Sequence, residues 1–351
     1  MKAKWLHLPI AMVAAVLLSA CGASTKPLHP PKPLSVLNLR TPGHALQQIS
    51  LVPGSSPPLL VANLTSDSIG LIFVHGLPIS TQMGPFQYAA AYNSTDFWSV
   101  NGLLDYTLVH WHSGHAVASY SIPWAFERSP KDTGTGDGPA GLVVDAFGPH
   151  VLMVARGGAE LVSVSSNGAL KVTVLPAASS PFQYEDLVES KGYVISLTDN
   201  GCALSAFDTA KGKVDLIHLP SGFIGIALNQ APGGVPVVLM RPVSPRLSCR
   251  EAALKAQAST LFVVRLSGAR LSKPTVHWRS LSALVQTNPD ATRYYEVIPL
   301  GPKHYQISVI GTHSKETTHR LSGTVTSYSW GRVDGISGFV WSTESKLYVM
   351  R

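Results

Sequence analysis

Charged side chains are scarce in this chain. Asp, Glu, Lys and Arg make up 13% of its 351 residues, against about 25% in ordinary soluble domains. Acidic residues are fewer than basic ones, with 20 Asp and Glu against 27 Lys and Arg, so the formal net charge is +7. No run of lysines or arginines forms the basic stripe that nucleic-acid binding requires. We therefore predict scattered surface charge and no nucleic-acid partner.

The sequence also lacks the common motifs of nucleophilic, metal-dependent and phosphate chemistry. The patterns G-x-S-x-G, H-E-x-x-H, S-x-x-K and the phosphate-binding loop do not occur. The densest acidic group is Glu185, Asp186 and Glu189. General acid–base catalysis needs two carboxylates facing one bond, and the sequence places no partner opposite this group. We expect no cofactor, and the sequence favours binding over catalysis while leaving enzymatic activity open.

The N-terminus has the three parts of an export signal. Lys2 and Lys4 precede an apolar run over residues 10–18, which is too short to span a bilayer as a mature helix. The run ends in Leu18-Ser-Ala-Cys21, which resembles the lipobox of bacterial lipoproteins. The resemblance implies a signal peptide over residues 1–20 and a Cys21 that carries palmitate-type acyl chains. It also implies a lipid-anchored protein on the extracytoplasmic side of the cell membrane.

Residues 21–33 form a separate segment in this reading. It contains Pro27, Pro30, Pro31 and Pro33, and such a composition favours an extended, semi-rigid tether. Beyond Cys21, the only cysteines are Cys202 and Cys249. An exported compartment permits a disulfide between them. Two unpaired thiols are the alternative, because sequence does not show whether the two residues meet in space.

Residues 34–351 are predicted to form one domain of repeated hairpins. Glycines punctuate the hairpins at positions 114, 168, 212, 268 and 311, about one blade length apart, since a four-stranded propeller blade takes about 40–50 residues. The tetrapeptide Pro-Phe-Gln-Tyr occurs at residues 85–88 and again at residues 181–184. Units that begin near residues 45, 85, 140, 181, 222, 281 and 324 give seven blades, and six or eight also fit.

The two ends of this domain complement each other. The chain stops one strand short after residues 346–351, and residues 34–39 form a strand with no partner of their own. Pairing the two would close the ring of an all-β propeller. A pair of β-sandwiches is the alternative, because short strands at regular spacing serve both folds.

One hairpin resembles a known repeat. Residues 207–214 read Phe-Asp-Thr-Ala-Lys-Gly-Lys-Val, and Asp208, Thr209, Gly212 and Lys213 fit the turn between the third and fourth strands of YVTN-type and quinoprotein-like propellers. The other units fit only in part. The resemblance implies the fold and transfers no ligand.

Three histidines are weak candidates for a metal site. His110 and His112 lie on one face of a predicted strand, with His115 just past the turn. Zinc or copper accepts imidazoles in this arrangement. Asp105 is the only carboxylate that the sequence places nearby, so we predict an ordinary polar hairpin and no metal.

Aromatic residues that the repeats place between blades are candidates for a binding face. They are Trp124, Phe126, Phe182 and Tyr184, with Arg128 beside them. Packing between blades is the alternative role. We therefore predict a binding, scaffold or sensor module that presents a propeller face to an unidentified protein or cell-envelope polymer. The alternative function is an exported propeller enzyme that acts on a carbohydrate or small metabolite.

Overall fold

The computed structural model describes most of the chain from residue 34 onward. The described residues are 34–38, 46–51, 60–64, 70–74, 77–80, 86–91, 96–102, 105–123, 138–155, 158–165, 167–175, 187–198, 201–244, 259–280, 284–311, 315–325, 327–333, 336–343 and 346–351. Residues 32–351 make up one compact unit. Within the described residues, no helix combines the length and the apolar character needed to cross a membrane.

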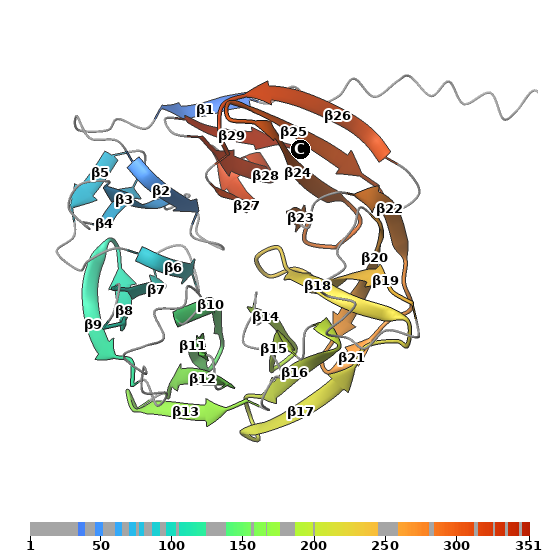
Figure 1. The fold of residues 1–351 in the computed structure, drawn as a ribbon. Coiled ribbons are helices and arrows are strands. Elements are labelled where there is room, and N and C mark those ends of the chain that lie inside the picture. Colours follow the sequence, from blue (N-terminus) through green and yellow to red (C-terminus); the bar gives the residue numbers. More distant parts are fainter. Residues whose placement is uncertain are drawn as a thin grey trace, which may run out of the picture. The chain divides into compact units, whose positions relative to one another are not determined.

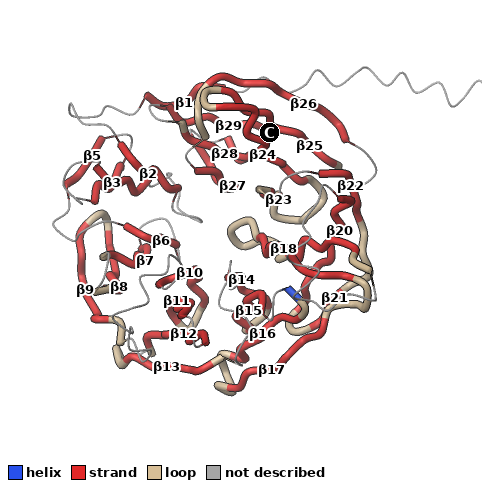
Figure 2. The backbone as a smooth tube through the Cα atoms, in the orientation of Figure 1, coloured by secondary structure: helices blue, strands red, loops and turns tan. Residues whose placement is uncertain are grey.

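Strands account for nearly all regular structure in the described residues (Figure 2). They form seven antiparallel sheets, six with four strands and one with five, which we number as blades 1 to 7. Blades 1 to 3 contain β2 (Leu46–Leu51), β3 (Leu60–Leu64), β4 (Gly70–Val74), β5 (Leu77–Ser80); β6 (Phe86–Ala91), β7 (Asp96–Asn101), β8 (Thr107–His112), β9 (His115–Ser121); and β10 (Gly138–Asp145), β11 (Gly148–Ala155), β12 (Gly158–Val164), β13 (Leu170–Val174).

Blades 4 and 5 contain β14 (Leu187–Ser190), β15 (Tyr193–Thr198), β16 (Ala203–Asp208), β17 (Lys213–His218); and β18 (Phe223–Asn229), β19 (Val237–Pro242), β20 (Ser259–Ser267), β21 (Arg270–Leu271), β22 (Val276–Ser280). Blades 6 and 7 contain β23 (Val285–Thr287), β24 (Tyr294–Gly301), β25 (His304–Ile310), β26 (Lys315–Ser322); and β27 (Ser327–Val333), β28 (Ile336–Ser342), β29 (Lys346–Met350), β1 (Leu34–Asn38).

The blades follow one another around a ring, with the first strand of each blade innermost (Figure 1). Blade 7 closes this ring because β1, from the other end of the described chain, pairs with β29 in antiparallel register. Leu34 lies opposite Val349, and Asn38 lies opposite Lys346. The predicted all-β propeller and its closing strand are confirmed, and the alternative pair of sandwiches is wrong.

The described blades begin near the predicted positions. Their first strands start at residues 46, 86, 138, 187, 223, 285 and 327. The turn glycines explain this agreement, because Gly114, Gly168, Gly212 and Gly268 follow the third strand of blades 2 to 5 with φ of +83°, +79°, +66° and +57°. Glycine adopts this left-handed conformation without the steric cost that a Cβ imposes. The local requirement for glycine therefore marks blades 2 to 5 in the sequence, whereas Gly311, the glycine predicted for the next blade, is not among the described glycines with positive φ.

The core lies between neighbouring blades. Strand β16 is buried along its whole length, because Leu204 and Ala206 pack toward blade 5 while Phe207 packs toward blade 3. Its neighbour β17 is largely exposed at the outer edge. Alternate side chains of a strand point to opposite faces, so each inner blade strand contributes to two interfaces. The result is a set of separate apolar clusters around the ring.

Candidate functional site

A cavity of about 620 Å³ lies where the first strands of four consecutive blades meet. Its walls are residues 88–91 of β6, 140–144 of β10, 187–189 of β14, and 228–233 at the end of β18 and in the turn that follows. These segments are far apart in sequence and reach one place only because the ring closes (Figure 1). The cavity is our candidate binding site.

The walls of this cavity are strand edges. Each of β6, β10, β14 and β18 is the end strand of its sheet and pairs with a neighbour on one side only. Side chains of β10 turn toward the two adjacent blade interfaces, with Leu142 and Val144 on one side and Ala140 and Val143 on the other. The free edge of a strand presents backbone N–H and C=O groups. The cavity therefore offers hydrogen-bonding backbone to a polar ligand.

Gln230 holds two of these walls together. Its Oε1 accepts the backbone N–H of Glu189 at 2.9 Å, and its Nε2 donates to the carbonyl oxygens of Glu189 (2.7 Å) and Gly234 (2.9 Å). The side chain thus links β14 of blade 4 to the turn after β18 of blade 5. Because both ends of the amide are occupied, its orientation in the wall is fixed.

Blade 5 is joined to blade 6 in the same manner. Asn229 Oδ1 accepts the backbone N–H of Thr287 at 2.9 Å. The N–H of Val235 donates to the Pro289 carbonyl at 2.7 Å, and the Arg265 guanidinium donates to the Ala291 carbonyl at 3.0 Å. These bonds cross between blades at the turn that joins the first and second strands. Hydrogen bonds between blades therefore fix the walls of the cavity in the absence of a ligand.

The groups that line the cavity are suited to binding. Glu189 is the only carboxylate among them, and its Oε1 accepts the N–H of Gly192 at 3.0 Å. Tyr88 is 37% exposed and adds a phenol and an aromatic face. Most other lining residues are Ala, Gly, Val and Leu. One carboxylate supplies half of an acid–base pair, whereas rigid amides, a phenol and strand edges can recognise a polar molecule.

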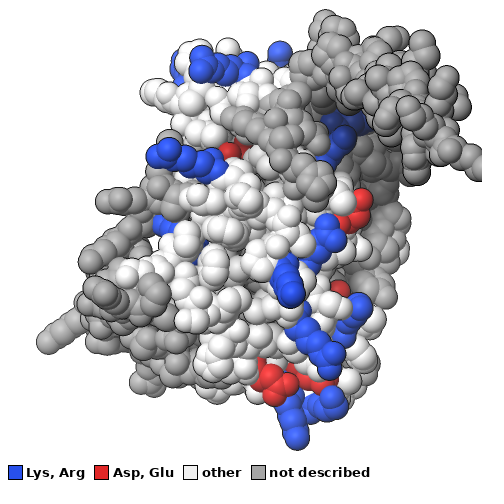
Figure 3. Space-filling view, turned by 90° about the vertical axis from the view of Figure 1, so that its right-hand side faces the viewer, with Lys and Arg blue, Asp and Glu red and all other residues white. Residues whose placement is uncertain are grey.

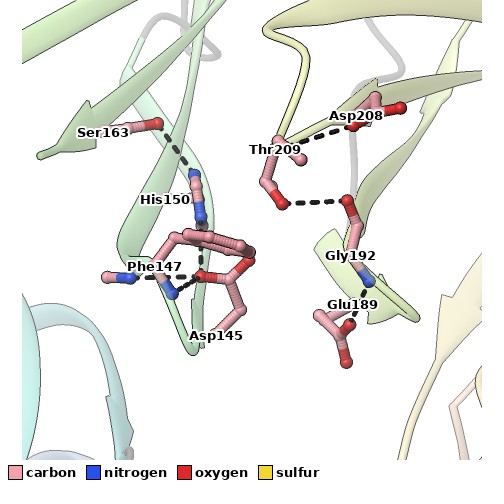
Figure 4. A network of polar contacts seen from close by, with 10 residues as sticks. Asp145, Phe147, His150, Ser163, Glu189, Gly192, Asp208 and Thr209 are labelled. Carbon is pink, nitrogen blue, oxygen red and sulfur yellow. Dashed lines mark hydrogen bonds and ion pairs between the residues drawn. The ribbon is translucent and has the colours of Figure 1, made fainter.

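A second polar cluster lies inside blade 3 (Figure 4). His150 Nδ1 is hydrogen-bonded to Ser163 Oγ at 2.8 Å, and its Nε2 lies 3.1 Å from Asp145 Oδ1. The side chains of His150 and Asp145 are only 4% and 5% exposed. Asp145 Oδ1 also accepts the N–H groups of Phe147 (2.7 Å) and Gly148 (3.1 Å). The carboxylate therefore closes the turn between β10 and β11.

Ser163, His150 and Asp145 are the residue types of a catalytic Ser-His-Asp triad, but their contacts are those of a cluster that stabilises a turn. In a triad the imidazole joins an exposed nucleophile to an acid that only orients it. Here Asp145 is occupied by a turn, and Gly148 brings that turn against β12, since a Cβ on Gly148 would stand 2.8 Å from the Val164 carbonyl oxygen. We assign the cluster to the stability of blade 3.

In blade 4 a carboxylate closes a different turn, the one between the third and fourth strands, β16 and β17 (Figure 4). Asp208 Oδ1 accepts the N–H groups of Ala210 (3.1 Å) and Lys211 (3.0 Å), and its Oδ2 binds Lys211 Nζ at 2.8 Å. Thr209 Oγ1 donates to the Gly192 carbonyl at 2.9 Å. The Lys211 ammonium, followed by its N–H, holds the pKa of Asp208 below its usual value. The conspicuous turn of the sequence thus ties two hairpins of one blade.

A smaller cavity of about 270 Å³ lies between blades 6 and 7. It is lined mainly by apolar groups, including Leu284 and Tyr328, and by Tyr305. Tyr305 Oη accepts the indole N–H of Trp341 at 2.6 Å, and burial raises the pKa of Tyr305 to about 12. Burial therefore keeps this phenol neutral at physiological pH.

Most residues predicted to form sites lie outside the described residues. Cys21 and Cys249 are among them, as are all five candidates for an aromatic face: Trp124, Phe126, Arg128, Phe182 and Tyr184. Cys202 is disulfide-bonded, while its pairing with Cys249 stays a prediction. The repeated tetrapeptide leads in its first copy to Phe86 and Tyr88, which the structure places on β6 rather than in a loop between blades.

Two of the three histidines, His110 and His112, contact a carboxylate that sequence reasoning missed. Asp96 Oδ1 lies 2.9 Å from His112 Nδ1 and 3.4 Å from His110 Nε2, because Asp96 is opposite His112 in the pairing of β7 with β8. His110 also stacks on Trp98, with ring centroids 4.4 Å apart. His115 is opposite His112 on β9. In the part of the chain that the structure describes, no three His, Cys, Asp or Glu side chains form a metal-binding group.

Comparison with known proteins supports the fold. No protein-family model and no curated protein sequence matches this chain. Among solved structures, the β-propeller domain of Myceliophteria thermophila Cps50 (Swd1) covers 90% of this chain and 99% of its own, with 9% identity and a TM-score of 0.57. A streptogramin B lyase covers 90% and 96%, with 11% identity and a TM-score of 0.55. BamB from Moraxella catarrhalis covers 86% and 84%, with 11% identity and a TM-score of 0.47.

These similarities describe the architecture of the chain. At identities of 9 to 11%, the likeness to the first two structures shows a shared β-propeller fold. Function has to be argued from the site, since one fold hosts many unrelated functions.

Proposed function

We propose that this chain is a lipid-anchored, extracytoplasmic β-propeller that acts by binding, through the cavity at the centre of blades 2 to 5. The observation that carries the proposal is the construction of the cavity. Four strand edges form its walls, and Gln230 and Asn229 fix the neighbouring blades to one another. A pre-formed pocket with few polar groups is the usual form of a ligand site.

Anchoring is the second part of the proposal. It rests on Leu18-Ser-Ala-Cys21 and the apolar run before it. A diacylated cysteine provides the two chains that stable membrane attachment requires. Through this anchor the propeller would present its face to an envelope protein or polymer.

The anchor is tested with Cys21→Ser in the host bacterium. We expect the wild-type protein in the membrane fraction, with a diacylglyceryl group on the peptide that begins at Cys21, as measured by mass spectrometry. The variant should lose this mass and leave the membrane fraction. Equal membrane retention of both proteins, with an unmodified peptide, contradicts the proposal.

The binding site is tested by site-specific crosslinking in the anchored protein. Tyr88 in the cavity is replaced by a photo-reactive phenylalanine analogue, and the matched control carries it at Val117, which is 56% exposed on the outer strand β9. We expect one defined crosslinked product from position 88, and we expect that product to be absent when the analogue is at position 117.

The enzyme alternative has one observation in its favour, the carboxylate of Glu189 in the cavity. One structural neighbour is a lyase by name. If position 88 gives no adduct, and a screened carbohydrate or metabolite is turned over by the wild-type protein and not by Glu189→Gln, the enzyme reading replaces the binding one.

A further inference from the structure

Basic residues stand at equivalent positions in consecutive blades. In blades 2 to 5, the strand after the third-to-fourth turn begins at or next to His115, Lys171, Lys213 and Arg270, and all four are exposed. In blade 6 the same position is occupied by Lys315. Turns of this type lie at one end of the antiparallel sheets, so the repeat places one basic residue per blade along one rim of the propeller.

Other exposed cations add to this rim between blades 3 and 5, and together with the repeated residues they are Lys171, Lys191, Lys211, Lys213, Arg270 and Lys273. The carboxylates beside them are Asp208 and Asp215, of which Asp208 is paired with Lys211 at 2.8 Å. Glu189 is directed to the Gly192 N–H at the cavity. Among the residues that the structure describes, cations therefore outnumber carboxylates on this strip, which we call the basic rim.

Contacts between blades show that the basic rim is continuous. Lys171 Nζ of blade 3 lies 5.9 Å from the centre of the Phe207 ring and beside Gly212, both in blade 4. Lys191 Nζ of blade 4 donates to Ser267 Oγ of blade 5 at 2.9 Å. Figure 3 shows several Lys and Arg along the side of the propeller that carries the outer strands of the later blades, with Asp and Glu among them.

We propose that the basic rim binds a linear polyanion, with successive phosphate or carboxylate groups lying across the turns of blades 3, 4 and 5. The cations are spread over three blades, with one to three in each, and do not converge on a point, which fits an extended chain better than a compact anion. Binding would release counterions from the polymer, so its affinity falls as salt rises. The proposal goes beyond the binding role given above, because none of the rim cations lines the central cavity.

The test measures binding of end-labelled, long-chain polyphosphate by fluorescence anisotropy over a salt series. The variant Lys171→Gln, Lys213→Gln, Arg270→Gln should bind at least about tenfold more weakly at low salt. The slope of log K against log salt should fall by about 2, since each neutralised phosphate of a single strand contributes about 0.7.

A matched control removes the same charge elsewhere. Lys303→Gln, Arg320→Gln, Lys346→Gln alters exposed residues at the second-to-third turns and at the end of β26, which lie at the opposite end of the sheets from the basic rim. We expect this variant to keep the wild-type affinity within about twofold, because charges beyond the Debye length of about 10 Å are screened. Lys171→Arg with Lys213→Arg should also keep it.

Three results overturn the proposal. The first is an equal loss of affinity in the control variant, which reduces the effect to net charge. The second is competition by pyrophosphate at the same phosphate concentration as the polymer. The third is binding to anionic lipid vesicles without binding to polyphosphate, which makes the rim a membrane surface. If the rim variant unfolds early in a thermal scan, the proposal is judged instead from the salt dependence of wild-type binding and from the affinity of the Lys171→Arg, Lys213→Arg variant. The crosslink from position 88 reports the cavity separately.

Discussion

Blades 3 and 4 each close a hairpin with a buried carboxylate, and the two carboxylates differ in the exposure of their charged partners. In blade 3, Asp145 and His150 are almost completely buried, and Asp145 Oδ1 serves two backbone N–H groups and an imidazole. In blade 4, Asp208 serves two N–H groups as well, but its third partner is Lys211, whose side chain is 69% exposed. The turn between β10 and β11 of blade 3 therefore relies on a buried charged partner, and the turn between β16 and β17 of blade 4 relies on an exposed one. We expect the contribution of each turn to the free energy of unfolding to depend on the burial of its partners, and not on how conspicuous its sequence motif is.

The largest effect is expected from Asp145→Ala. The substitution leaves the N–H groups of Phe147 and Gly148 without their acceptor and removes the buried carboxylate beside His150, so the free energy of unfolding should fall by about 3–5 kcal/mol. Urea unfolding followed by tryptophan fluorescence measures this. Asp215→Ala, at an exposed position of β17, is the control and should stay within about 0.5 kcal/mol. A loss below about 1 kcal/mol for Asp145→Ala would remove the distinction between the two blades.

Gln230→Ala should have the second-largest effect on stability. The first strand of blade 4 is held by a side chain of blade 5, whereas the Asp145 contacts of blade 3 lie within that blade. The variant removes three hydrogen bonds at a cavity wall that water can enter, so we expect a loss of about 1–3 kcal/mol. Hydrogen exchange should increase at the Glu189 N–H, which donates to Gln230. Gln306→Ala is the control, since its side chain donates to Ser308 within the same blade. Unchanged exchange at Glu189 would show that blade 4 does not depend on this contact.

The sequence predicts the blades well because their signals are local. Gly114, Gly168, Gly212 and Gly268 are imposed by the φ of single turns, and alternation imposes the strands between them. The cavity has no such signal. Gln230 and Glu189 are 41 residues apart, and they meet only because β14 and β18 become adjacent inner strands of a closed ring. Asp145, His150 and Ser163 are likewise brought together by pairing of β11 with β12, and separately they look like ordinary turn and strand residues.

Asp208→Asn should have a smaller effect that depends on pH. The folded protein holds the pKa of Asp208 below 3.8, mainly through the hydrogen bond from the Lys211 ammonium. A lowered carboxyl pKa stabilises the fold above the unfolded value, and this stabilisation disappears as the pH falls through the folded value. Wild type should therefore be more stable than Asp208→Asn at pH 7, and the difference should vanish at strongly acid pH in parallel urea titrations. A stability difference between the two proteins that does not change with pH would show that the effect comes from altered packing or hydrogen bonding and not from the charge of Asp208.

Lys211→Met should have the smallest effect, and it isolates what exposure does to the pair. The substitution keeps the methylene stem and leaves Asp208 bonded to the N–H groups of Ala210 and Lys211. Exposed ion pairs gain little, because water and salt screen them. The unfolding midpoint should shift slightly at low salt and coincide with that of wild type at high salt. The loss from Asp145→Ala should persist at high salt, because its partners are buried away from mobile ions. Parallel salt dependence of both variants would mean that the two turns share one environment, and that burial does not explain their difference.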